Sequence, residues 1–134
     1  MSIQPIKRGH IGPEVSDLHK GLLSLLAHQP GISDNDRETL RKRLMRDVND
    51  HKFGKATADI VGIYQYLLKH WPNDFPQIPP KLKPVVQSIQ ETRAGTGNGE
   101  VDDATAEALN WLVGTFRKLP KLTTKQVKIL LGTK

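Results

Sequence analysis

Apolar residues recur at three- and four-residue spacing along most of the chain, and this spacing predicts amphipathic helices. The first predicted helix begins at Pro13, where a helix needs no N–H, and ends before Gln29. Ser33 is the predicted N-cap of a second helix, which runs to about residue 49 and is highly charged on its outer faces. A third helix is predicted over about residues 55–70. Its predicted buried face consists of Ile60, Val61, Tyr64, Leu67, Leu68 and Trp71.

The pattern in the second half of the sequence predicts shorter elements. A proline-rich stretch over residues 72–82 indicates a stiff, extended connection. Helices are then predicted from Pro84, from about 103 to 113 behind the N-cap Asp102, and near the C-terminus behind Thr123 or Thr124. No segment shows sustained strand alternation, so we expect at most a tiny pairing between residues 99–101 and 52–53. The pattern predicts an all-α fold, a compact bundle of five to six helices.

The length of 134 residues fits one domain. Residues 1–11 are predicted to form a flexible arm before the first helix. Residues 12–113 are predicted to form the helical domain, with an inserted helix at about residues 31–50. Residues 114–134 are predicted to form a C-terminal helical extension.

Two sets of residues recur at constant offsets, which predicts an internal duplication. Pro13, Val15, Leu18 and His19 recur as Pro84, Val86, Ile89 and Gln90. Phe53, Thr57 and Val61 recur as Val101, Thr105 and Leu109. The inserted helix accounts for the difference between the two offsets, so the chain reads as two helix–turn–helix units. Chance matching at these few positions is the alternative.

Each of the two turns leads into a helix with a threonine in its first turn. The first reads Phe53-Gly54-x-x-Thr57 and the second reads Val101-Asp102-x-x-Thr105, with Leu18-His19 before the first and Tyr64-Gln65 between them. This arrangement resembles the peptidoglycan-binding-like domain, a small helical module of cell-wall enzymes and envelope proteins. Departures from the family pattern are His19 in place of glutamine, His51-Lys52 in place of aspartate-glycine, and Tyr64 in place of phenylalanine.

The resemblance implies a non-catalytic module that recognises bacterial cell-wall peptidoglycan, through its glycan or its stem peptide, for anchoring or targeting. It implies a ligand groove between helices near the two turns. The ligand-binding residues carried over to this chain are Tyr64, Gln65, Asp102, Asn110 and Trp111. Divergent copies of the module resemble segments of bacterial toxin-complex and contractile injection-machine proteins. The alternative is therefore a structural or adaptor protein that docks another protein through the groove or through the charged helix at 33–50.

A net charge of +6 favours anionic partners such as wall polymers. The basic residues gather in two clusters: Arg37, Arg41, Lys42, Arg43 and Arg46, and Lys118, Lys121, Lys125 and Lys128. Nucleic acid is an unlikely partner, because acidic residues flank the first cluster and no aromatic residues interleave with it.

The sequence offers little catalytic chemistry. It has no cysteine, and its five histidines include no pair at the helical spacing of a zinc site. The glycine-rich residues 95–99 lack the lysine of a phosphate-binding loop, and Asp102-Asp103 suit a helix start better than a catalytic dyad. We therefore expect no enzyme activity, no metal and no cofactor. No bilayer-spanning run or signal peptide is visible, so a protein of the envelope or exterior would need another export route.

Overall fold

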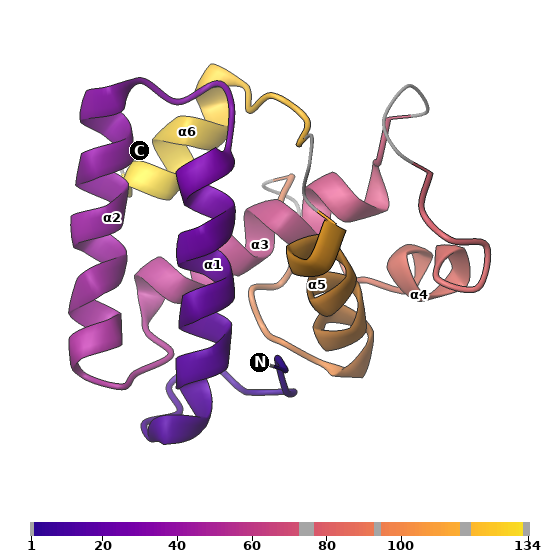
Figure 1. Cartoon of the computed structure of the whole chain (residues 1–134), viewed down its shortest axis with the longest axis horizontal. Helices are drawn as coiled ribbons and strands as arrows, with labels where there is room; N and C mark the ends of the chain where they lie inside the picture. Colours follow the sequence, from indigo (N-terminus) through magenta and orange to yellow (C-terminus); the bar gives the residue numbers. More distant parts are fainter. Residues whose placement is uncertain (1, 73–76, 93–94, 116–118, 133–134) are drawn as a thin grey trace.

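The computed structural model describes residues 2–72, 77–92, 95–115 and 119–132. Helices dominate these ranges and confirm the predicted all-α bundle (Figure 1). In chain order the elements are a short 3-10 helix at Pro13–Val15, then α1 (Ser16–His28), α2 (Asp34–Asn49), α3 (Lys55–Lys69), α4 (Lys83–Gln87), α5 (Asp103–Thr115) and α6 (Thr124–Leu131).

Helix α3 forms the centre of the bundle. It contacts α1 and α2 on one side, α4 and α5 on the other, and α6 (Figure 1). The predicted inward residues are buried, apart from the half-buried Trp71, and so are Thr57, Gly62, Ile63 and Gln65. The periodicity predicts one apolar face, whereas the helix is enclosed on nearly all sides. A helix in this position must bury polar side chains, and each of them needs a partner.

The helix ends follow local capping rules. Ser33 accepts a hydrogen bond from the backbone N–H of Asp36, and Thr123 forms a reciprocal capping box with Gln126. These contacts confirm Ser33 and select Thr123 over Thr124 as the cap of α6. Helix α4 is only a little more than one turn long, so Ile89 is buried just beyond the helix end.

The N-terminal residues 2–11 correct the expectation of a loose arm. Ile3 and Ile6 are buried in the core, with 2% and 7% of their surface exposed. The arm forms isolated β-bridges with both turns, Ile6 with Val101 and Ile11 with Lys52. The turns therefore pair with the arm, and the expected pairing between residues 99–101 and 52–53 is wrong.

The inserted helix and the C-terminal extension belong to the same bundle. Helix α2 contacts α1, α3 and α6, and Leu40, Leu44 and Leu130 from α2 and α6 are buried in the common core. Residues 116–118 and 133–134 of the predicted extension lie outside the described residues, as does Lys118 of the second basic cluster. Among the helices of the described ranges, none has the length and apolar character required to cross a bilayer.

Candidate functional site

The two turns are built alike. Phe53 and Val101 each precede the N-cap of the following helix, and both point inward, with 1% and 2% of their surface exposed. Thr57 and Thr105 each occupy the third helical position and are fully buried. The backbone N–H at this position has no acceptor inside its own helix, so each turn needs an acceptor from elsewhere.

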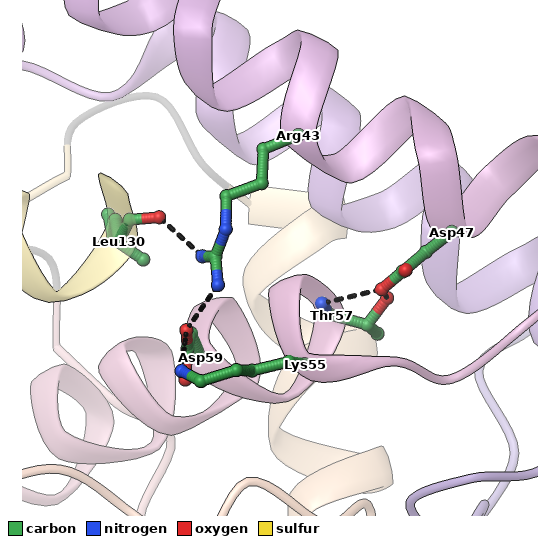
Figure 2. Close-up of polar contacts among 6 residues, drawn as sticks. All are labelled: Arg43, Asp47, Lys55, Thr57, Asp59 and Leu130. Atoms are coloured by element: carbon green, nitrogen blue, oxygen red, sulfur yellow. Dashed lines mark hydrogen bonds and ion pairs between the residues drawn. The ribbon is translucent and has the colours of Figure 1, made fainter. Parts of the chain in front are cut away.

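At the first turn that partner comes from another helix. Asp47 of α2 accepts hydrogen bonds from the Thr57 backbone N–H at 3.0 Å and from the Thr57 hydroxyl at 2.7 Å (Figure 2). His19 Nε2 lies 3.0 Å from the same hydroxyl oxygen. Because the Thr57 proton goes to Asp47, His19 must donate from Nε2–H. The result is a chain of hydrogen bonds, partly buried at Asp47, that joins α1, α3 and α2.

Gly54 and His19 show how tightly this first turn is packed. A Cβ at Gly54, the N-cap of α3, would lie 2.5 Å from Asp47 Oδ1. The Asp47 carboxylate therefore occupies the space that a local capping side chain would need. Burial lowers the pKa of His19, because the charged imidazolium would lose its hydration there.

At the second turn the partner is local. Asp102 Oδ1 accepts from the Thr105 backbone N–H at 2.8 Å, which confirms the predicted N-cap. Gln65 of α3 donates to Thr105 Oγ1 at 2.9 Å and to the Glu100 carbonyl at 2.8 Å, and its Oε1 accepts from Gly99 N–H at 2.9 Å. Gln65 therefore organises the loop before α5 rather than facing solvent.

Tyr64 is also committed to the interior. It is fully buried, and its hydroxyl donates to Gln29 Oε1 at 2.9 Å. Burial raises the pKa of this phenol, so it stays protonated. Tyr64 and Gln65 are thus both buried and hydrogen-bonded inside the bundle, in contrast to the ligand-binding positions that the resemblance implies for them.

Asn110 and Trp111 occupy the outer part of α5 and are half-buried. Asn110 forms two hydrogen bonds to the backbone of Ile3 in the arm. Trp111 packs edge-to-face on Trp71, with ring centroids 5.7 Å apart. Of the five predicted site residues, Gln65 and Asp102 meet at Thr105, while Tyr64, Asn110 and Trp111 each contact a different part of the chain.

Part of the first basic cluster is structural. Arg43 donates to Asp59 Oδ2 at 2.9 Å and to the Leu130 carbonyl at 2.6 Å, which joins α2 to α3 and to the end of α6 (Figure 2). Lys55 contacts the same Asp59 oxygen at 3.0 Å. Arg37 donates to the Gln29 carbonyl at 2.8 Å, beyond the C-terminus of α1. These guanidinium groups hold helix ends and are therefore less available to an anionic partner.

Several hollows open on the surface of the described residues, and two of them bear on function. One has a volume of about 290 Å³ and lies beside Trp71, where Lys83, Gln87 and Ile78 contribute to its lining. The other, about 420 Å³, lies between α1 and α2 and includes Leu23 and Met45. No pattern of spacing in the sequence marks either hollow, because each combines residues from separate segments.

Among the described residues, no group of three or more histidine, aspartate or glutamate side chains is close enough together to hold a metal ion. Comparison with protein-family models, curated proteins and solved structures finds no match. The contacts of the chain itself therefore carry the functional argument.

Proposed function

We propose that this chain is a non-catalytic binding module that recognises bacterial cell-wall peptidoglycan. The observation that carries the proposal is the pair of matched turns, in which an inward Phe53 or Val101 precedes a helix with a bonded threonine at its third position. This is the arrangement on which the resemblance to the peptidoglycan-binding-like domain rests.

The hollow beside Trp71 is the best candidate for the ligand surface. An indole face suits the apolar side of a sugar ring, and the neighbouring Gln87 amide and Lys83 ammonium can bind hydroxyl, amide or carboxylate groups. Lys83 and Gln87 are exposed. Trp71 thus replaces the buried Tyr64 and Gln65 as the aromatic centre of the proposed site.

Sedimentation with purified sacculi tests the proposal. We expect the chain to pellet with sacculi at low salt and at high salt, and Lys83→Glu to reduce pelleting at both. Lys125→Glu on α6 is the matched control. Lys125 is exposed and lies outside the hollow, and the substitution changes the net charge by the same amount. If both variants lost pelleting equally, or if pelleting vanished at high salt, the interaction would depend on net charge alone, which would contradict a specific site.

A second function, docking in a bacterial toxin-complex or contractile injection apparatus, is favoured by the hollow between α1 and α2. Leu23, Leu26 and Met45 give it an apolar floor, with Glu38 and Arg41 among the charged residues around it. This composition suits a protein partner better than a glycan. Met45→Glu should then abolish association with purified components of such an apparatus while leaving sedimentation with sacculi unchanged. Undiminished association of that variant would exclude this surface.

A further inference from the structure

The N-terminal arm lies between α1 and α5 in the way that a bound peptide does (Figure 1). The Ile3 N–H donates to Asn110 Oδ1 at 2.8 Å, and Asn110 Nδ2–H donates back to the Ile3 carbonyl at 2.9 Å. Three residues further on, Ile6 and Val101 exchange two backbone hydrogen bonds of 2.8 and 3.1 Å. All four bonds use only the main chain of the arm, so they do not depend on its side chains.

The arm buries two aliphatic side chains three positions apart, and this spacing adds selectivity. Ile3 and Ile6 are buried, while Gln4 and Pro5 between them are exposed. A Cβ at Gly21 of α1 would lie 3.1 Å from Ile3 Cδ1, so the missing side chain leaves the room that Ile3 fills. We call the space between α1 and α5 that residues 2–6 occupy the groove. It favours an extended chain with aliphatic residues three positions apart.

The walls of this groove are held together independently of residues 2–6. Helices α1 and α5 both contact α3, and the backbone next to Val101 is fixed by Gln65 and Asp102. Residues 7–10 leave the groove as an exposed segment, in which the backbones of Gly9 and His10 are hydrogen-bonded to Phe53. Release of residues 2–6 would therefore break neither these contacts nor the packing of α1 and α5 on α3.

We propose that this groove between α1 and α5 is a peptide-binding site that residues 2–6 fill as an internal stand-in. The occupant in trans is an extended segment of a partner protein with the aliphatic-x-x-aliphatic pattern of Ile3 and Ile6. Binding of that segment releases the arm. The site is separate from the hollow beside Trp71 and goes beyond wall recognition. The tethered arm is present at a high effective concentration, so a partner segment must bind more tightly than the arm or be presented repeatedly.

The test uses the full chain with Ile3→Ser and Ile6→Ser, which weakens the arm without shortening the protein. The probe is a fluorescent peptide of residues 2–8, Ser-Ile-Gln-Pro-Ile-Lys-Arg, followed by anisotropy. We expect saturable binding, at least about tenfold tighter than to the unaltered chain, because the arm no longer competes. A peptide with serine at both isoleucine positions should not bind.

Asn110→Leu in the same background removes both hydrogen bonds to the peptide main chain. The dissociation constant should rise at least about tenfold. Glu107→Gln is the matched control on α5, because Glu107 is exposed, and it should leave binding unchanged. Absence of binding to a folded arm variant, or equal binding after Asn110→Leu, would overturn the proposal.

A milder variant keeps the test decisive if the double substitution prevents folding. Ile3→Ala in the full chain leaves the Ile6–Val101 pairing in place, and NMR can follow the side-chain amide of Asn110. We expect added peptide to shift this amide signal in a saturable way. An amide signal that stays fixed at saturating peptide, in a chain with native dispersion, would contradict the proposed site.

Discussion

The first turn, before α3, and the second turn, before α5, meet the same structural requirement with different residues. Each must provide a partner for the N–H of a threonine at the third helical position and for that threonine's hydroxyl. The second turn uses its own N-cap, Asp102, together with Gln65 from α3. The first turn has glycine at the N-cap and takes both partners, Asp47 and His19, from other helices.

This difference shows what the inserted helix α2 does. Without Asp47, the first turn of α3 would have no acceptor for the Thr57 N–H and hydroxyl at that site. Arg43, four residues earlier in α2, adds the links to Asp59 and to the end of α6. Helix α2 therefore provides the side-chain cap of the central helix α3, whereas α5 is capped by its own N-cap residue, Asp102.

The largest effect is expected from removing the buried amide of the second turn. Gln65→Leu leaves Gly99 N–H, the Glu100 carbonyl and Thr105 Oγ1 without their partner. Since each unpaired buried group costs about 1–3 kcal/mol, the free energy of unfolding should fall by about 3 kcal/mol or more. Urea unfolding followed by circular dichroism measures this change.

Gln90→Leu is the control for that substitution and also tests the duplication. Gln90 is the sequence counterpart of His19, yet it is exposed. The substitution should change stability by less than about 0.5 kcal/mol, as is usual for a surface position. If Gln90→Leu were as damaging as Gln65→Leu, Gln90 would have a structural role like that of His19, and Gln65 would not be the residue that replaces His19 at the second turn.

The two caps should differ in strength, and truncating each to alanine measures the difference. Asp47→Ala removes two bonds, both of which join α2 to α3, so we expect a loss of about 2–3 kcal/mol. Asp102→Ala removes one bond at a more exposed helix start, so the loss should be about 1 kcal/mol. Equal losses in urea unfolding would show that the origin of the cap, local or remote, makes no energetic difference.

A double substitution should convert the first turn to the design of the second. Gly54→Ser alone forces its Cβ against the Asp47 carboxylate, since the two would be 2.5 Å apart. In the Asp47→Ala background that space is free, and serine can cap α3 locally. The double-mutant cycle should therefore show a favourable coupling of about 1 kcal/mol or more. Simple additivity of the two losses would mean that serine at position 54 does not act as a cap.

The contrast between the turns also separates what the sequence predicts from what it does not. Ser33 and Asp102 were predictable as caps, and Thr123 was one of two candidates, because each acts on a neighbour a few residues away. Asp47 was not, because its partner Thr57 lies across a turn and on another helix. The available signal was Gly54, since an N-cap glycine offers no side-chain acceptor and implies one from elsewhere.

The candidate site shows the same limit. Asn110 was expected to bind a ligand, whereas in the structure its amide is hydrogen-bonded to the backbone of the chain's own Ile3. Tyr64 and Gln65 were expected near a ligand, but helical periodicity does not reveal that α3 is enclosed by its neighbours. Burial from all sides depends on long-range packing, and a local pattern of apolar residues contains no information about it.

The smallest expected effect concerns the donors to the two threonines, His19 and Gln65. Burial lowers the pKa of His19 below its ordinary value of 6.5, so as the pH falls through 6.5 the unfolded chain takes up a proton that the folded chain excludes. The contribution of neutral His19 is thus fully present above pH 6.5 and declines on acidification. His19→Gln should cost less than about 1 kcal/mol at pH 8, because glutamine can still donate to Thr57 Oγ1 as Gln65 does to Thr105. Between pH 8 and pH 5 the glutamine variant should lose less stability than the unaltered chain, measured as the shift in the urea midpoint. Parallel losses in both chains would show that His19 does not titrate on unfolding, and the first turn would then differ from the second only in its cap.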